Sequence, residues 1–153
     1  MLHVALWEPE IPPNTGNVAR LCAATGTRLH LIGRLGFRLD DRSLKRAGLD
    51  YWDAVDLVRH VTFEDFERAI NPSPPRIWLV ETPAPRAYPR AKFADGDCLL
   101  FGAESKGLPP GVREKYAAAH IGIPMPGGKV RSINLATAVG IVLYEALRQL
   151  HDW

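Results

Sequence analysis

The segment Ile123-Pro-Met-Pro-Gly-Gly-Lys-Val-Arg-Ser-Ile-Asn-Leu135 joins a short apolar run to the longest apolar helix that the sequence predicts. Two comparable glycine-bearing segments precede it, Asn14-Thr-Gly-Asn-Val-Ala-Arg20 and Leu99-Leu-Phe-Gly-Ala-Glu-Ser-Lys-Gly-Leu-Pro109. Each places flexible backbone beside a few polar side chains at the end of an expected strand. Main-chain amides and carbonyls of such turns can hold a ligand. The three segments are therefore the first candidates for a binding site.

Short apolar runs alternate with helical patterns along the chain. Strands are expected at Leu2–Trp7, Arg28–Ile32, Ala54–Val58, Ile77–Glu81, Asp97–Phe101 and His120–Ile123. Helices are expected at Asn14–Thr25, ended by Gly26 in the left-handed conformation, at Ser43–Leu49, at Thr62–Ile70, capped by Thr62 and ended by Asn71-Pro72, and at Pro110–Tyr116 and Ser132–Leu150. This alternation favours an α/β fold with a mostly parallel sheet and helices on both faces. A length of 153 residues without repeats or a clear linker predicts one domain over residues 1–153.

The helix expected over Ser132–Leu150 is apolar on nearly every side. Leu135, Ala138, Val139, Val142 and Ala146 line one side, and Ala136, Gly140, Leu143 and Leu147 line another. A helix of this kind is buried on more than one face. Gly140 costs about 1 kcal/mol relative to alanine in a helix interior, which close approach of another backbone would offset. The pattern fits a central helix within one chain and a homodimer interface equally well.

The composition is that of an ordinary globular protein, with 46% hydrophobic and 24% charged residues and a formal net charge of +2. This charge is compatible with a nucleic-acid partner without arguing for one. Cys22 and Cys98 are isolated in apolar surroundings, which indicates buried free thiols in a reducing compartment. No metal site is expected, because the sequence has no CxxC or Cys/His cluster. A signal peptide is not expected, since Glu8 and Glu10 follow the first apolar run, and a membrane span is not expected because no stretch approaches about eighteen apolar residues.

A local excess of positive charge follows the second expected strand. It comprises Arg34, Arg38, Arg42, Lys45 and Arg46, against only Asp40 and Asp41. Such a stretch is either a solvated face or a patch that follows a phosphate backbone, and the sequence leaves both open.

The familiar nucleotide-binding and hydrolase patterns do not fit. A dinucleotide fingerprint G-x-G-x-x-G would follow the first strand, where the chain instead reads Glu8-Pro-Glu-Ile-Pro-Pro-Asn14. Gly102 and Gly107 have P-loop spacing, but Leu108 and Pro109 replace the phosphate-binding lysine and the metal-binding hydroxyl residue. No nucleophile elbow supports a Ser-His-Asp site, and the histidines are scattered along the chain.

Taken together and in order, the remaining motifs resemble the SPOUT superfamily of RNA methyltransferases, and within it the small TrmL-type tRNA 2′-O-methyltransferases that modify the wobble nucleotide. The resemblance runs almost end to end. It is carried by Glu8-Pro-Glu-Ile-Pro-Pro-Asn-Thr-Gly-Asn17, Arg46-Ala-Gly-Leu-Asp-Tyr51, Phe101-Gly102 and Tyr144-Glu-Ala146. It implies an α/β sheet whose C-terminal part is tied in a deep trefoil knot, an exception to the rule that chains avoid knots.

The resemblance also implies S-adenosylmethionine as cofactor, with S-adenosylhomocysteine as product and no metal. The family holds this cofactor in the knot with the backbone of three crossing loops. Matching the motifs places its contacts at Val80, Gly102, Ile123 and Ser132. The glycines 102, 107, 127 and 128 would let these loops approach one another and a bent cofactor, although plain turn chemistry also explains such glycines.

Three catalytic residues are implied in the same way: Arg20, Arg131 and Tyr144. Arg20 matches the family's N-x-G-x-x-x-R motif and is expected to contact the target nucleotide and assist deprotonation. Because the pKa of arginine exceeds about 12, help from the RNA phosphate is expected. Arg131 is expected to bind RNA phosphate, and Tyr144 to hydrogen-bond a substrate oxygen. From the residues alone, Arg20 also fits a helix-surface arginine and Tyr144 a core tyrosine.

Three further polar residues are expected to shape the nucleotide pocket: Asn14, Glu104 and Asn134. The function implied is methyl transfer to C34 or U34 of tRNA, with leucine isoacceptors as substrates. The implied partners are the tRNA anticodon stem-loop and a second copy of the chain, packed through the knot region and the C-terminal helix. The expected location is the cytoplasm, away from membranes. Two alternatives stay open: methylation of another tRNA position or of rRNA, and a non-catalytic RNA-binding protein of this fold.

Overall fold

Parallel strand pairing organises the whole chain. The computed structural model describes residues 1–40, 42, 44, 46, 52–70 and 76–153. In this part, β1 (His3–Trp7), β2 (Arg28–Ile32), β3 (Leu57–His60), β4 (Ile77–Val80), β5 (Cys98–Phe101) and β6 (His120–Ile121) form one sheet. The strand order is β3-β2-β1-β5-β4-β6, and each neighbouring pair in it is parallel. The helices are α1 (Pro12–Thr25), α3 (Phe63–Ile70), α4 (Pro110–Lys115) and α5 (Leu135–His151), and short 3-10 turns are η1 (Trp52–Ala54), η2 (Tyr88–Arg90) and η3 (Ala117–Ala119).

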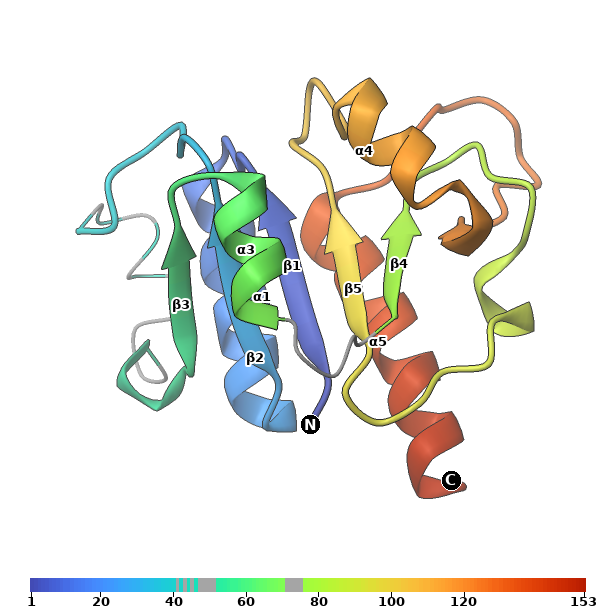
Figure 1. Cartoon of the computed structure of the whole chain (residues 1–153), viewed down its shortest axis with the longest axis horizontal. Helices are drawn as coiled ribbons and strands as arrows, with labels where there is room; N and C mark the ends of the chain where they lie inside the picture. The colour runs from blue at the N-terminus through green and yellow to red at the C-terminus, as the bar shows by residue number, and fades with distance from the viewer. Residues whose placement is uncertain (41, 43, 45, 47–51, 71–75) are drawn as a thin grey trace.

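Helices cover both faces of the sheet, as the alternation predicted. Figure 1 shows α3 in front of the sheet and α1 and α5 behind it. Successive residues of a strand point to opposite faces. Val4 and Leu6 of β1 accordingly join the core beneath α1 and α5, whereas Ala5 joins the core beneath α3. The predicted α/β fold with a mostly parallel sheet is therefore confirmed.

Side-chain caps and prolines set several element bounds that differ from the predicted ones. α1 begins at Pro12 rather than Asn14, because prolines suit the first helical positions, where an N–H has no helical partner. α5 begins at Leu135 rather than Ser132, because the side chain of Asn134 caps it by accepting from the main-chain N–H of Thr137. Gly26 ends α1 in the left-handed conformation, with φ of 65°.

The third strand was predicted at the wrong place. The prediction gave Ala54–Val58, but η1 occupies the start of that range and β3 is Leu57–His60. Pairing with β2 explains the shift, because Leu29 lies opposite Leu57 and its N–H donates to the carbonyl of Asp56. The helix capped by Thr62 is confirmed, since its hydroxyl accepts from the main-chain N–H of Asp65. Of the helix predicted at 43–49, the described residues Leu44 and Arg46 are helical and the other positions lie outside the described residues, as does the predicted stop at residues 71–72.

β2 has the predicted bounds, Arg28–Ile32, whereas the other strands are slightly shorter than predicted. β4 ends at Val80, β5 begins at Cys98 and β6 ends at Ile121. The strand predicted to reach Ile123 stops because Gly122 forms a bridge with Ala87 instead of continuing along β4. Cys98 and Cys22 are buried free thiols, as expected, and burial raises the pKa of both, that of Cys22 to about 12.

α5 is a central helix of this chain. Its buried residues are Leu135, Val139, Val142, Leu143, Ala146 and Leu147. It packs on α1 and on the sheet within the same core. The close backbone approach expected at Gly140 is not found in the described chain, because an added β-carbon would meet only Leu21 Cδ2, at 3.9 Å.

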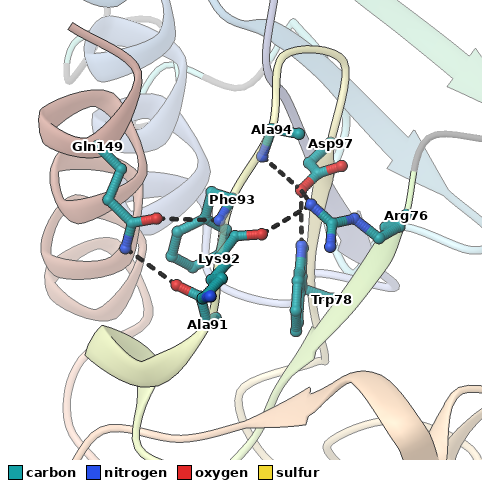
Figure 2. Close-up of polar contacts among 8 residues, drawn as sticks. All are labelled: Arg76, Trp78, Ala91, Lys92, Phe93, Ala94, Asp97 and Gln149. Carbon is teal, nitrogen blue, oxygen red and sulfur yellow. Dashed lines mark hydrogen bonds and ion pairs between the residues drawn. The ribbon is translucent and has the colours of Figure 1, made fainter. Parts of the chain in front are cut away.

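The connection between η2 and β5 is fastened to the C-terminal end of α5. Figure 2 shows the amide of Gln149, whose Oε1 accepts from Phe93 N at 3.0 Å and whose Nε2 donates to the Ala91 carbonyl at 3.0 Å. A few residues further along, the buried carboxylate of Asp97 accepts from Trp78 Nε1 at 2.8 Å and from Ala94 N at 2.9 Å. These bonds hold the connection in one conformation at the end of the sheet away from the strand carboxyl termini.

Within the described part of the chain, no helix combines the length and the apolar character needed to cross a bilayer.

Candidate active site

A cavity of about 710 Å³ opens where the strand ends meet the start of α5. Ligand sites of open parallel sheets lie at the carboxyl ends of the strands, and this cavity has that position. It collects most of the predicted site residues: Asn14, Val80, Gly102, Glu104, Ile123, Arg131, Ser132 and Asn134. The three glycine-bearing segments therefore do converge on one site.

The turn between Gly102 and Leu108 forms one wall and requires glycine. A β-carbon at Gly102 would lie 2.3 Å from the carbonyl carbon of Gly107 and 2.6 Å from the nitrogen of Leu108. Gly107 has φ of 66°, and its N–H closes the turn by donating to the Ala103 carbonyl at 2.9 Å. Gly102 thus permits close backbone approach within this turn, and Gly107 supplies its left-handed residue.

The other two glycines do not have that role. A β-carbon at Gly127 or Gly128 would meet no other atom of the described residues within 4 Å. Gly128 has φ of 63° and closes a turn by donating its N–H to the Met125 carbonyl. In the described structure these two positions fit the plain turn chemistry rather than the crossing of loops.

Glu81 supports the glycine turn from the neighbouring strand. It follows β4 directly, and its Oε2 accepts from Leu108 N at 2.8 Å while its Oε1 accepts from Arg113 Nε at 2.5 Å. Both Glu81 and Arg113 line the cavity. Sequence reasoning missed them; the available signal was a carboxylate directly after a four-residue apolar strand, at the edge where sites form.

A chain of polar contacts links the start of α5 to α1 and to the loop after β5. Asn134 Nδ2 donates to Asn14 Oδ1 at 2.9 Å, and Asn14 Nδ2 donates to Glu104 Oε2 at 3.4 Å. Asn134 Oδ1 meanwhile accepts from Thr137 N. The three residues predicted to shape the nucleotide pocket are thus held by one another as well as exposed to the cavity.

Two glutamates join the loop after β1 to the loop after β5 at the mouth of the cavity. Glu104 accepts from the main-chain N–H groups of Glu10, at 2.9 Å, and Ile11, at 2.7 Å. Glu10 accepts in return from the hydroxyl and the main-chain N–H of Ser105. The bonds from Ser105, the side chain first, hold the pKa of Glu10 below its ordinary value.

Two of the predicted catalytic residues lie outside the cavity, which Arg131 lines. Arg20 is an exposed residue of α1. Tyr144 lies on α5 with 45% of its surface exposed and its ring beside that of Trp153, so it is not a core tyrosine. Any contact of these two side chains with a substrate is made beyond the cavity wall.

The groups that line the cavity suit the binding and positioning of a ligand. They combine main chain from glycine turns with apolar Val80, Phe101 and Ile123 and with the cations Arg113 and Arg131. Among the described residues, no group of three or more His, Cys, Asp or Glu side chains is placed to hold a metal ion. Such a cavity fits an organic ligand that has an apolar ring and polar groups reached by main-chain atoms.

Comparison with known proteins gives concordant similarities. The model of the SpoU rRNA Methylase family matches residues 1–144. The tRNA (cytidine(34)-2'-O)-methyltransferase of Escherichia coli (strain K12) is 47% identical over 98% of this chain and 94% of that protein. A solved structure concerning the 2-OH methylation of C/U34 on tRNA matches with a TM-score of 0.95 and 50% identity, over 100% of this chain and 98% of that chain. An AdoMet-bound rRNA methyltransferase from Sinorhizobium meliloti matches with a TM-score of 0.87 and 29% identity, over 97% of this chain and 56% of that chain.

Proposed function

The chain belongs to the SpoU rRNA Methylase family, and on this premise we propose that it transfers a methyl group from S-adenosylmethionine to the ribose 2′-oxygen of nucleotide 34 in tRNA. The observation that carries the proposal is the 47% identity, over nearly the full length of both chains, to the Escherichia coli tRNA (cytidine(34)-2'-O)-methyltransferase. The leucine isoacceptors are the proposed substrates, read at C34 or U34 of the anticodon stem-loop in the cytoplasm.

The cavity fits S-adenosylmethionine as the methyl donor. The turn from Gly102 to Leu108 forms its glycine wall. No side chain fits at Gly102, so main-chain atoms rather than side chains meet a ligand there. Val80, Gly102, Ile123 and Ser132 are the proposed contacts, and all of them line the cavity. When bound, the donor supplies an electrophilic methyl group on a sulfonium, and S-adenosylhomocysteine is the product. The related AdoMet-bound methyltransferase supports this choice of cofactor.

The protein side of the reaction is positioning and proton removal. A ribose hydroxyl must lie within roughly 3–3.5 Å of the methyl carbon and in line with it, and holding it there supplies several kcal/mol of barrier lowering. In our proposal Arg131, at the cavity, binds RNA phosphate. Arg20 contacts the target nucleotide and, with help from the phosphate of that nucleotide, assists removal of the hydroxyl proton. Tyr144 hydrogen-bonds a substrate oxygen.

We further propose that the active form is a homodimer packed through α5. The positions of Arg20 and Tyr144 outside the cavity support this, because a second copy brings further surface to a tRNA that reaches into one cavity. Tyr144 of α5 and Trp153, which follows the helix, lie ring beside ring and expose 45% and 66% of their surface, and exposed apolar patches mark interaction sites.

A trefoil knot in the C-terminal part is also proposed. Its support is the way later chain segments fasten to the connection between β4 and β5. Tyr88 N donates to the Gly122 carbonyl and Gly122 N donates to the Arg86 carbonyl, each at 2.9 Å. Gln149 binds the same connection at Ala91 and Phe93 (Figure 2). Gly122 precedes the loop at residues 123–134 and Gln149 follows it, so segments from both sides of that loop bind the connection between β4 and β5.

Methyl transfer to defined RNA tests the proposal. Purified protein is incubated with labelled S-adenosylmethionine and tRNA lacking the modification, and the product is mapped by mass spectrometry. The proposal expects one 2′-O-methyl group at nucleotide 34. Methylation elsewhere in tRNA or in rRNA supports the alternative substrates, and cofactor binding without transfer to any RNA contradicts the assigned reaction.

A further inference from the structure

We propose that Glu81 is a positioning residue for the methyl-donor site: it holds the Gly107–Leu108 peptide, and through it the glycine wall, in the shape that receives the donor. This inference rests on the proposed function, because it concerns the cavity assigned to the donor. The residue takes no part in the predicted site, and its role follows from its contacts with three separate segments.

The backbone of Glu81 is held by residues of β6, the strand at the edge of the sheet. Its N–H donates to the Ile121 carbonyl at 3.1 Å, and its own carbonyl lies 2.7 Å from His120 Nε2. The side chain therefore starts from a rigid base at the end of β4, with only 21% of it exposed. A short side chain on such a base can hold a neighbouring loop with little loss of its own freedom.

The carboxylate spans from this base to the turn after β5. One oxygen accepts from Leu108 N and the other from Arg113 Nε. The fit is close, because a β-carbon at Gly107 would lie 2.9 Å from Glu81 Oε2 and 3.1 Å from a terminal nitrogen of Arg113. The turn is thus held between the end of β4 and α4 by one charge-assisted bond to its main chain.

The peptide that Glu81 holds is the one that packs against Gly102. The nitrogen of Leu108 lies 2.6 Å from the place of a β-carbon at Gly102, and the Gly107 carbonyl carbon lies 2.3 Å from it. Displacement of this peptide therefore changes the shape of the cavity at Gly102, which is a proposed contact of the methyl donor. Because the Arg113 guanidinium pairs with the Glu81 carboxylate, we expect the effect to come from wall geometry and not from attraction to the positive charge of the donor.

Glu67 provides a matched control. Its carboxylate is also largely buried, with 19% of the side chain exposed, and it also binds a cation of α4, Lys115, at 2.5 Å. It reaches α4 from α3, accepts from the Tyr116 hydroxyl as well, and is not part of the cavity lining. Replacing Glu67 thus loosens α4 without releasing the glycine turn.

The test measures donor affinity without RNA. Calorimetry gives the Kd of S-adenosylmethionine and of S-adenosylhomocysteine for wild type, Glu81→Ala, Glu81→Gln, Arg113→Ala and Glu67→Ala, each checked for folding by circular dichroism. We expect Glu81→Ala to raise both Kd values by roughly tenfold or more, the cost of losing a charged hydrogen bond. Glu81→Gln keeps an acceptor for Leu108 N and restores part of the affinity, and Glu67→Ala leaves both values unchanged.

The outcomes separate this inference from the proposed function. If wild type binds both ligands and Glu81→Ala binds them equally well, or if only the charged donor is weakened, the positioning role is wrong. If wild type binds neither ligand, the cofactor assignment and the inference fail together. Steady-state kinetics add a second readout: the KM for the donor rises while the KM for tRNA stays constant and kcat changes less than KM. Should Glu81→Ala not fold, Glu81→Gln carries the comparison with a smaller expected rise in both Kd values, and wild-type Kd values for Glu81→Gln would then overturn the role.

Discussion

Glu10 and Glu104, 94 residues apart in the chain, each hold the loop that carries the other. Glu104 accepts from the main-chain N–H of Glu10 at 2.9 Å, and Glu10 accepts from the main-chain N–H of Ser105, the neighbour of Glu104, at 3.0 Å. This reciprocal contact fixes the start of α1, and with it the predicted residue Asn14, against the cavity. The arrangement makes Glu104 a structural element of the site before any RNA is bound.

Replacing Glu104 by alanine should therefore cost both stability and activity. The change leaves the main-chain N–H groups of Glu10 and Ile11 and the amide of Asn14 without their acceptor. We expect a loss of about 1–3 kcal/mol in the free energy of unfolding, measured by urea denaturation, because unsatisfied donors carry that cost. Ser105→Ala, which removes one hydroxyl donor to Glu10, is the control and should lose less. Equal stability of Glu104→Ala and wild type would contradict the role of this contact.

The sequence predicted the architecture because that depends on local, repeated signals. Apolar runs of four or five residues mark buried parallel strands, and Thr62 and Gly26 mark helix ends, so the strand and helix order follows. The third strand was misplaced because its position depends on pairing with β2, which no local pattern encodes. α5 was started too early because Ser132 and Asn134 are both cap residues, and the structure uses only Asn134.

The candidate site was predictable where a motif carried it and not elsewhere. Gly102, Ile123 and Ser132 came from the family resemblance, and the structure places them around one cavity. Glu81 and Arg113 were missed because their role arises from contacts over 27 and 32 residues with a turn and with each other. Periodicity reports which face a residue occupies but not which distant N–H group its side chain meets.

Gly102 and Gly127 give a paired test of the glycine wall. Gly102→Ala should abolish measurable binding of S-adenosylhomocysteine, because the new β-carbon would lie within 3 Å of the Gly107–Leu108 peptide. Gly127→Ala introduces a β-carbon into open space and should bind as wild type does. Calorimetry of the folded variants measures both. Normal binding by Gly102→Ala would show that the wall is not where the ligand is held.

Replacing Arg20 or Tyr144 should lower the rate of methyl transfer without changing the affinity for the cofactor. Both lie outside the cavity lining, so Arg20→Ala and Tyr144→Phe should leave the Kd of S-adenosylhomocysteine within about twofold of wild type. Loss of general acid-base assistance typically costs about 10²–10⁴-fold in rate, and we expect kcat of Arg20→Ala to fall in that range. Single-turnover methylation of tRNA measures the rate. Unchanged rates for both variants would remove them from the proposed mechanism.

Gly140 offers a stabilising substitution. Gly140→Ala should raise the free energy of unfolding by about 1 kcal/mol, because alanine favours the helix by that amount. Among the described residues, the added methyl group meets only Leu21 Cδ2, at an ordinary contact distance of 3.9 Å. Thermal and urea unfolding measure the change, and sedimentation compares the assembly state. A destabilised variant with altered sedimentation would indicate that the small residue is needed between two copies of the chain.

Three histidines on adjacent strands should make the stability of the fold depend on pH. His30 Nε2 lies 2.9 Å from His3 Nδ1, and His30 Nδ1 lies 2.9 Å from His60 Nε2, beneath Phe66. Burial lowers the pKa of all three, that of His30 to about 3, and the nearby Arg28 acts in the same direction on His3 and His30. The central ring therefore stays neutral, donating to one neighbour and accepting from the other.

The sign follows from proton binding. The unfolded chain protonates these imidazoles below their ordinary pKa of about 6.5, whereas the folded chain protonates them only at lower pH, His30 at about 3, so stability is complete above pH 6.5 and falls as the pH drops toward 3. A single histidine contributes at most about 1.4 kcal/mol per pH unit. Urea unfolding between pH 5 and pH 7.5 measures the slope above the range in which carboxylates titrate. His30→Gln keeps a polar side chain without a titrating ring and should flatten the slope; a slope as steep as that of wild type would place its origin outside the histidine chain.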